Sequence, residues 1–423
     1  MNSTSPSSKP DVNLSLTLKS SDPACRPPCH VDQAALKPEE RGILLIQLLL
    51  TCAKHTASSN LHHADACLRQ ISPLASVSGD PMQRLAARFA YALATRLVKR
   101  WPGLYKALNH SQPSNKPEVL LDRPFPCLAF AYAIIARTLV HAMSEERVIH
   151  IVDLGSGDPN LWASLMQRFV LMGHGSPGPS HLRITCVNSN KAVLERLGTR
   201  LVKEAEGLDM PFQFNPLNVS LRELTVDMVK VRSGEALAFV SVLGLHVLLA
   251  EDDRVDANFG FGGARGSKGK IGVKDCKQMG QFLEMVKSMA PKVFLLVEQE
   301  ADHNLNRLVE RFVEGLHYYS AMFDSLEGNY GREERVGMEE MFGREIEDIV
   351  ACEGLEREER HERYARWMVR FGSGGFKPVR LWCDGKQMVE ASGKGGYKIV
   401  NEKAGVMICW HERPLYAVSA WTC

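Results

Sequence analysis

Apolar residues recur with a helical period through the first third of the chain. RGILLIQLLLTCAKHTAS (41–58) is apolar on nearly every side, which is typical of a helix packed on both sides. In DPMQRLAARFAYALATRLVKRW (80–101), an Asp-Pro pair marks a helix start and the following apolar residues lie three or four apart. FPCLAFAYAIIARTLVHAM (125–143) predicts another buried helix. Residues 39–143 are therefore expected to form a helical cap that contains a leucine-rich region.

The hydrophobic period changes after residue 143. RVIHIVDL (147–154), LRITCVN (182–188) and PKVFLLVEQE (291–300) are short apolar runs, which predict buried strands. EALAFVSVLGLHVLL (235–249) predicts a further strand. Amphipathic patterns between these runs predict helices. Strands that alternate with helices indicate a parallel sheet covered on both faces.

The last part of the chain predicts strands of another kind. YKIVNE (397–402) and VMICWHERPLYAVSAW (406–421) lie close together, as hairpin strands added at a sheet edge would. The predicted fold class is α/β, with a methyltransferase-like doubly wound (Rossmann-type) core over 144–423 and the N-terminal helical cap. Residues 39–423 are expected to fold as one unit.

Composition limits the remaining segments. Residues 1–38 are rich in Ser, Pro and Lys and are expected to form a disordered tail, because they bury too little apolar surface. Cys25, Cys29 and His30 lie in this tail, and their poor spacing favours a flexible segment over a metal site. The 11 cysteines follow no repeating spacing, which favours reduced thiols in the cytosol or nucleus. No apolar run is long enough to span a membrane.

Charge argues against a chain that binds DNA without help. There are 51 basic and 49 acidic residues, a net charge of +2, whereas a DNA-binding domain normally carries a basic excess. Both signs alternate through 332–366, which indicates a solvated or partner-facing helix. The exception is a Gly/Lys-rich loop, whose four cations support only weak, non-specific contact with phosphates. These cations are Arg265, Lys268, Lys270 and Lys274.

One loop has the pattern of a cofactor site. VDLGSGDPN (152–160) follows a predicted strand, at the edge where doubly wound sheets bind ligands. Gly155 allows a sharp turn, Gly157 allows close approach of a ligand, and the following helix N-terminus favours a carboxylate. With Asp153, these glycines resemble the first motif of class I S-adenosylmethionine-dependent methyltransferases.

Two residues depart from that methyltransferase pattern. Pro159 occupies the position of the usual third glycine. Asn188 ends the second strand, where an acidic residue normally holds the ribose hydroxyls, so the bidentate carboxylate contact is lost. We therefore predict a vestigial cleft and neither cofactor, metal site nor catalytic residue. The alternative is a small-molecule methyltransferase, in which His246 could act as a general base; otherwise His246 is a core residue.

Two other groups of residues admit a functional and a structural interpretation. Glu298, Glu300, Asp302 and His303 could form a metal or acid–base site, but helix caps or partners of arginine are favoured. Two Leu-x-x-Leu-Leu segments would bind a partner's hydrophobic groove if exposed, although their apolar neighbours favour core packing. The leucines concerned are Leu45, Leu48 and Leu49 in one segment and Leu245, Leu248 and Leu249 in the other.

Taken in order, these segments resemble the plant GRAS family of transcriptional regulators. The leucine-rich helices are followed by IHIVD (149–153) and LGLHVLL, then by EQEADHN and FGREIEDIVACEGLEREERHERYARW (342–367), and the chain ends near Ser-Ala-Trp. The resemblance marks as motif residues His150, Asp153, Arg344, Glu345, Arg413 and Trp421. MQRLAARFAYALATRLVKRWPGLYKALN and LDMPFQFNP are similar to the Scarecrow-like protein three subgroup.

The resemblance implies a nuclear regulator of transcription that acts by binding other proteins. The implied partners are zinc-finger DNA-binding factors and other GRAS proteins, DELLA-type members included, with homo- or heterodimers as one form. DNA would be reached through these partners, and gibberellin response and root development are the processes associated with the subgroup.

Overall fold

The computed structural model describes residues 37–99, 126–171, 179–251, 273, 275–392 and 395–423. The predicted disordered tail, with Cys25, Cys29 and His30, lies outside the described residues except at its last two positions. The four cations of the Gly/Lys-rich loop also lie outside them.

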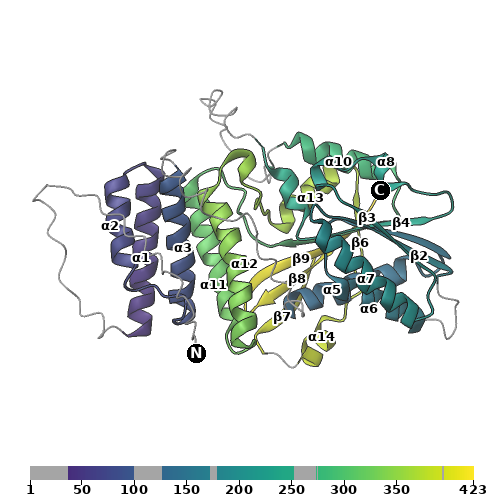
Figure 1. Ribbon diagram of the computed structural model, residues 1–423, viewed down its shortest axis with the longest axis horizontal. Helices are drawn as coiled ribbons and strands as arrows, with labels where there is room; N and C mark the ends of the chain where they lie inside the picture. Colours follow the sequence, from purple (N-terminus) through teal and green to yellow (C-terminus); the bar gives the residue numbers. More distant parts are fainter. Residues whose placement is uncertain (1–36, 100–125, 172–178, 252–272, 274, 393–394) are drawn as a thin grey trace, which may run out of the picture.

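A single mixed sheet of nine strands runs through the described part of the chain (Figure 1). Its order is β3-β2-β1-β4-β5-β9-β8-β7, with β6 paired to β9. The first five strands in this order are parallel, and the others join through antiparallel pairs. The strands are β1 Val148–Asp153, β2 His181–Val187, β3 Phe212–Leu217, β4 Ala236–Val242, β5 Val293–Gln299, β6 Lys377–Val379, β7 Tyr397–Glu402, β8 Gly405–Trp410 and β9 Arg413–Thr422.

Alternate residues of the central strands enter two separate cores. Leu295 and Val297 face the core formed with α5 (Pro126–Ala142), α6 (Pro159–Leu171) and α7 (Lys191–Gly207). Phe294 and Leu296 face the other core, formed with α10 (Lys277–Ser288) and α13 (Tyr364–Ser373). Both faces of the sheet are thus buried, which explains the continuous apolar runs of β4 and β5. This confirms the predicted mixed α/β class.

The remaining elements are short. They are the helices α8 Val226–Val229 and α14 Gly385–Ser392 and the 3-10 turns η3 Leu221–Glu223, η4 Leu245–Leu249 and η5 Gly354–Glu356.

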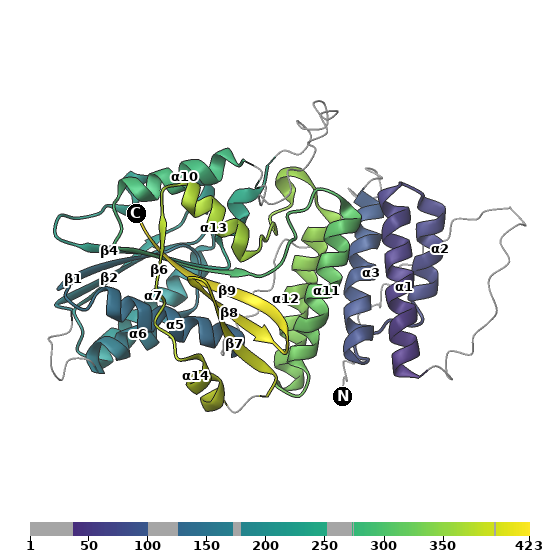
Figure 2. The same ribbon diagram turned by 180° about the vertical axis from the view of Figure 1, so that it is seen from behind.

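Five long helices lie side by side at one end of the molecule (Figures 1 and 2). They are α1 Pro38–Ala57, α2 Leu61–Ile71, α3 Pro81–Lys99, α11 Leu308–Leu326 and α12 Arg332–Ala351. Arg84 of α3 donates to Glu339 at 2.8 Å and to Glu327 at 2.7 Å, and Phe89 packs edge-to-face on Phe312 at 5.1 Å. These contacts join α3, near the N-terminus, to α11 and α12, which follow β5 in sequence.

The predicted N-terminal cap is not confirmed in this arrangement. Helices α1 and α3 pack on α11, and α3 also packs on α12, while α2 packs on α1 and α3. Helix α5, expected in the same cap, instead packs against α6 and the sheet. The reason is that α5 is apolar on most sides and is enclosed by β5, β8, β9 and α6, whereas α3 has a single apolar face.

Two local predictions also differ from the structure. The half-buried edge strand β3 was not expected, because polar Gln213 and Asn215 interrupt its apolar pattern. The predicted strand 235–249 ends at Val242, and the chain then turns through Leu243, with φ of 52°, into η4. A side chain at Gly244 would approach the Leu154 carbonyl oxygen to 2.9 Å, so the turn requires glycine.

The described helices include none that is both long and apolar enough to cross a bilayer. The nine cysteines of the described chain are all free thiols, in agreement with the reduced state expected from their spacing.

We predict that deleting residues 410–423 unfolds the domain, because β9 pairs with β5, β6 and β8. A truncated chain with the melting temperature and circular dichroism spectrum of the full protein would contradict this prediction.

A milder change is Trp421→Ala: Trp421 is fully buried and stacks on Phe371 at 4.7 Å. This substitution should lower the free energy of unfolding by about 3–5 kcal/mol in chemical denaturation. Val400→Ala, at a residue 46% exposed on β7, is the control and should change it by less than about 0.5 kcal/mol.

Candidate functional site

The glycine loop after β1 lies tightly against the start of α7. Gly155 has φ of 101° and Gly157 has φ of 61°, both in the left-handed region that favours glycine. A Cβ at Gly157 would lie 3.1 Å from Cγ1 of Val193 and 3.7 Å from the Asn188 amide nitrogen. The backbone turn therefore has the expected shape, but the space beside Gly157 is filled by the protein's own side chains.

Asp153, at the end of β1, is fully buried and accepts hydrogen bonds from its own loop and neighbours. Ser156 donates from its backbone N–H at 2.9 Å and from its hydroxyl at 2.5 Å, and Trp162 Nε1 donates at 2.9 Å. The Cys186 thiol lies 3.5 Å away. Burial raises the pKa of Asp153, while these donors act in the opposite direction. The carboxylate thus holds the loop closed.

Asn188, which replaces the usual acid, also serves the local fold. Its side-chain oxygen accepts the Asn190 backbone N–H at 2.8 Å, and its carbonyl accepts from Asn218 Nδ2 at 3.1 Å. Both polar residues of the predicted cleft are therefore occupied by internal hydrogen bonds. A cavity of about 650 Å³ lies elsewhere, between α10 and α13, and is not lined by the loop.

His150, in the middle of β1, ties three strands together. Its Nε2 donates to the Thr185 hydroxyl at 2.8 Å, and its Nδ1 accepts from Arg183 at 2.9 Å. Arg183 also forms an ion pair with Glu235, just before β4. Burial, followed by the Arg183 charge, lowers the pKa of His150 to about 4. His150 is therefore a neutral hydrogen-bonding residue of the sheet.

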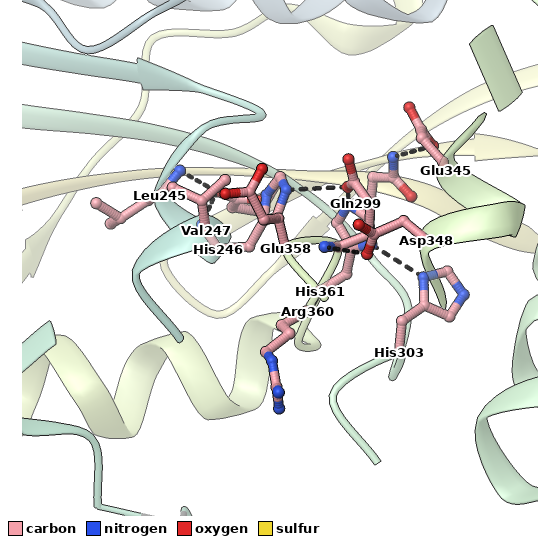
Figure 3. A network of polar contacts seen from close by, with 12 residues as sticks. Leu245, His246, Val247, Gln299, His303, Glu345, Asp348, Glu358, Arg360 and His361 are labelled. Carbon is pink, nitrogen blue, oxygen red and sulfur yellow. Dashed lines mark hydrogen bonds and ion pairs between the residues drawn. The ribbon is translucent and has the colours of Figure 1, made fainter. Parts of the chain in front are cut away.

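A second polar centre lies at the ends of β4 and β5 (Figure 3). Glu298, the sixth residue of β5, accepts the backbone N–H groups of Leu245 at 2.9 Å and His246 at 3.1 Å. It also accepts His246 Nδ1–H at 2.8 Å. Glu298, which is 1% exposed, thus accepts the first backbone N–H groups of η4 and orients the side chain of His246.

The other side of His246 faces a segment far along the chain. Its Nε2 lies 3.1 Å from Glu359 Oε2, and His361 Nε2 lies 3.1 Å from the same oxygen. His361 Nδ1 in turn lies 3.0 Å from His303 Nδ1. Burial disfavours the charged form of His246, but Glu298 and Glu359 outweigh it and raise its pKa well above the ordinary value. Each ring nitrogen of His246 therefore already faces a carboxylate, so neither nitrogen is open to act as a general base.

Further carboxylates surround this polar centre. Glu345 accepts from Tyr319 at 2.6 Å and from Gln299 at 3.0 Å, and Asp348 accepts the Glu359 backbone N–H at 2.9 Å. Burial, followed by the Glu359 charge, raises the pKa of Glu345 to about 7 and that of Asp348 to about 6. Glu345, Asp348 and Glu359 therefore lie close enough together for their carboxyl groups to influence one another's ionisation.

The group predicted at 298–303 divides between two roles. Glu300 accepts the Tyr364 N–H at 2.7 Å at the start of α13, and Asp302 pairs with Arg366 at 2.7 Å, as the structural interpretation expects. Glu298 and His303 instead join the polar centre. Sequence analysis missed His361 and Glu359, because they lie in a charged stretch, 332–366, without ligand spacing.

The leucines proposed for partner binding lie in the interior. Leu45, Leu49, Leu245, Leu248 and Leu249 are at most 3% exposed, and Leu48 packs against the core from a partly buried position. The docking interpretation is therefore corrected in favour of packing, because these side chains cannot enter a partner's groove while the domain is folded.

The remaining motif residues lie on the bundle and the last strand. Arg344 and Glu345 are half-buried on α12. Arg413 begins β9, donates to Glu314 at 3.0 Å and lies 5.9 Å from the centre of the Tyr318 ring. Trp421 is the last residue but one of β9 and donates from Nε1 to the Ser419 hydroxyl at 3.0 Å.

The fold and the closed loop define a class: a mixed α/β protein whose cofactor-like loop is occupied by its own side chains. Residues 45–422 match the GRAS domain family, and the chain belongs to this family. GRAS proteins are plant transcriptional regulators, so the function predicted from the sequence is confirmed at this level.

Relatives and a solved structure agree with this assignment. Scarecrow-like protein 3 of Arabidopsis thaliana is 40% identical, over 92% of this chain and 90% of that protein, as the subgroup resemblance predicts. DELLA protein RGL1 of the same plant is 32% identical over 91% of this chain and 71% of its own length. The crystal structure of SCL7 from Oryza sativa, at 29% identity, superimposes with a TM-score of 0.69 and covers 89% of this chain and 99% of that one.

We predict that Glu300 makes stability depend on pH. Burial raises its pKa to about 7, so its contribution to stability is present below its ordinary pKa of 4.5 and is lost as pH rises through about 7. Between pH 5 and 8, wild type should lose about 2–3 kcal/mol of unfolding free energy relative to Glu300→Gln in urea denaturation. Glu390→Gln, at an exposed position on α14, should follow wild type. Parallel pH profiles for Glu300→Gln and wild type would contradict this.

Proposed function

We propose that the protein is a nuclear transcriptional co-regulator that acts by binding other proteins and carries no catalytic site. The observation that carries this proposal is the closed glycine loop. Asp153 and Asn188 direct their side-chain oxygens to donors of their own loops. Binding S-adenosylmethionine would require breaking these contacts without a second-strand carboxylate to receive the ribose.

Methyl transfer is the alternative function, and one feature favours it. Gly155 and Gly157 keep the backbone turn at the carboxyl edge of β1, the position at which doubly wound sheets bind ligands. Against it, both ring nitrogens of His246, the candidate base, are held by carboxylates, those of Glu298 and Glu359.

The proposed partners are zinc-finger DNA-binding factors and other GRAS proteins, DELLA-type members included, in gibberellin response and root development. Charge supports this indirect route to DNA. Acidic residues nearly equal basic ones across the chain. Three arginines of the described fold, Arg84, Arg183 and Arg311, are buried and paired with glutamates. A DNA-binding partner would supply the phosphate contacts that this distribution lacks.

The division into a tail (1–38) and a folded unit (39–423) is part of the same proposal. Packing of α1 and α3 on α11 supports a unit whose N-terminal helices and α/β part depend on each other.

Calorimetric titration with S-adenosylmethionine tests the absence of a cofactor. We expect no heat beyond dilution, because the loop's acceptors are already bonded and the cleft beside Gly157 is filled. Asp153→Asn, which keeps an acceptor oxygen in place, and Asp153→Ala are the comparison variants. Micromolar affinity in wild type that Asp153→Ala abolishes would overturn the proposal in favour of the methyltransferase.

A gel-shift series at near-physiological salt tests the indirect route to DNA. We expect the purified protein alone to show no sequence preference among promoter fragments, because its basic residues are interspersed with nearly as many acids. Addition of a zinc-finger DNA-binding factor should give a slower, sequence-dependent complex that contains both proteins. Sequence-specific nanomolar binding by the purified protein alone would make it a DNA-binding factor in its own right.

A further inference from the structure

Three potential metal-ligand atoms converge in the polar centre between η4 and the segment after α12. They are His246 Nε2, Glu359 Oε2 and His361 Nε2, and all three lie within 4.8 Å of one another. Figure 3 shows His246 and His361 directed into this centre from different segments. Two imidazole nitrogens and a carboxylate oxygen are a ligand set that zinc proteins use when a further position stays open.

The outer nitrogens of both histidines are already held in place. His246 donates Nδ1–H to Glu298 at 2.8 Å, the carboxylate–histidine arrangement that orients metal ligands, and its Nε2 is thereby directed at Glu359 Oε2, 3.1 Å away. His361 Nδ1 lies 3.0 Å from His303 Nδ1, which fixes that ring in the same way. These contacts present both Nε2 atoms to one point.

One of these nitrogens lacks a hydrogen bond within the described residues. His361 is fully buried, and its Nε2 makes no hydrogen bond within the described residues although Glu359 Oε2 is only 3.1 Å away. A buried polar nitrogen without a hydrogen bond costs free energy, which a metal bond would remove.

The distances suit a small tetrahedral ion. Zinc bonds of about 2.0–2.1 Å place adjacent ligand atoms of a tetrahedron roughly 3.4 Å apart. The two nitrogen–oxygen distances here are both 3.1 Å. The Glu359 side chain is 26% exposed, so an ion has a path from solvent to the otherwise buried site.

The local charge also favours a cation. Glu298 and Glu359 contact His246, and Asp348 and Glu345 lie near Glu359. Arg360 follows Glu359 in sequence, but Figure 3 shows its side chain directed away, and its guanidinium donates to the Gly354 carbonyl at 2.8 Å. A divalent ion would offset this concentration of negative charge.

We propose that His246, Glu359 and His361 bind one zinc ion, with Glu298 and His303 as positioning residues. The ion would join η4, at the end of β4, to the segment that connects α12 with α13. One segment precedes α11 in sequence and the other follows α12. With water in its fourth position, the ion would hold these two segments together, independently of the protein-binding function.

The test begins with the full-length wild-type protein, dialysed against zinc and then against metal-free buffer. We expect about one zinc per chain by mass spectrometry, and a lower melting temperature after chelation that added zinc restores. Cobalt substitution should give the intense visible bands of a tetrahedral site without thiolate charge-transfer absorption in the near ultraviolet. Less than a tenth of a zinc per chain, with no change in melting temperature, would overturn the proposal.

Variants then locate the ion. His246→Gln, His361→Gln and Glu359→Gln should each lose the stoichiometric zinc and the cobalt spectrum, and Glu298→Gln should weaken zinc affinity about 10- to 100-fold. His62→Gln, at an exposed histidine of α2, and the pair Cys25→Ala and Cys29→Ala should retain both signals. Zinc that persists in Glu359→Gln and His361→Gln, or disappears with the cysteines, would place the ion elsewhere. If the histidine variants fail to fold, the wild-type stoichiometry and the partly exposed Glu359→Gln variant decide the matter.

Discussion

The carboxylate of Glu298 is the constraint on which much of the molecule depends. A buried charge is tolerated only when paired and hydrogen-bonded, and this one takes two backbone N–H groups and one imidazole from the turn after β4. The path of the chain out of β4 is therefore fixed by β5, its neighbour in the sheet. Because His246 also reaches Glu359, the same carboxylate indirectly positions the segment that leads into α13 and hence one face of the sheet.

The buried carboxylates of Asp153 and Glu298, both at this edge of the sheet, obtain their hydrogen-bond donors in different ways. Asp153 is satisfied by donors within 33 residues of itself in sequence, so the glycine loop closes locally. The centre around His246 gathers groups more than 110 residues apart. The hydrogen bonds of Asp153 occupy the glycine loop without involving distant parts of the chain. The centre around His246 instead connects a segment that precedes α11 in sequence with one that follows α12. This difference is consistent with a fold that has kept its sheet edge for structural reasons.

The sequence predicted the parts of the fold whose signal is local. Short apolar runs located β1, β2, β4 and β5, and the Asp80–Pro81 pair located the start of α3, where Asp80 accepts the Gln83 N–H at 2.9 Å. The placement of α5 on the sheet, away from α1–α3, could not be predicted, because helical periodicity does not identify the element on which a helix packs. His361 and Glu359 were missed for a related reason: His303 and His246, which they contact, lie 58 and 113 residues away in sequence, and charge alternation alone indicates a solvated surface.

Asp153 shows why a motif at this edge does not by itself indicate an enzyme. The carboxylate can accept hydrogen bonds from a ligand or from residues of its own loop. The neighbouring residue types decide which of the two occurs. Ser156 and Trp162 bring donors to 2.5 and 2.9 Å, and Val193 fills the space that Gly157 leaves open. Displacing those donors would leave buried polar groups without partners, at a cost of about 1–3 kcal/mol each. The glycines then serve the turn itself, since its left-handed φ angles are needed whether or not a ligand is bound.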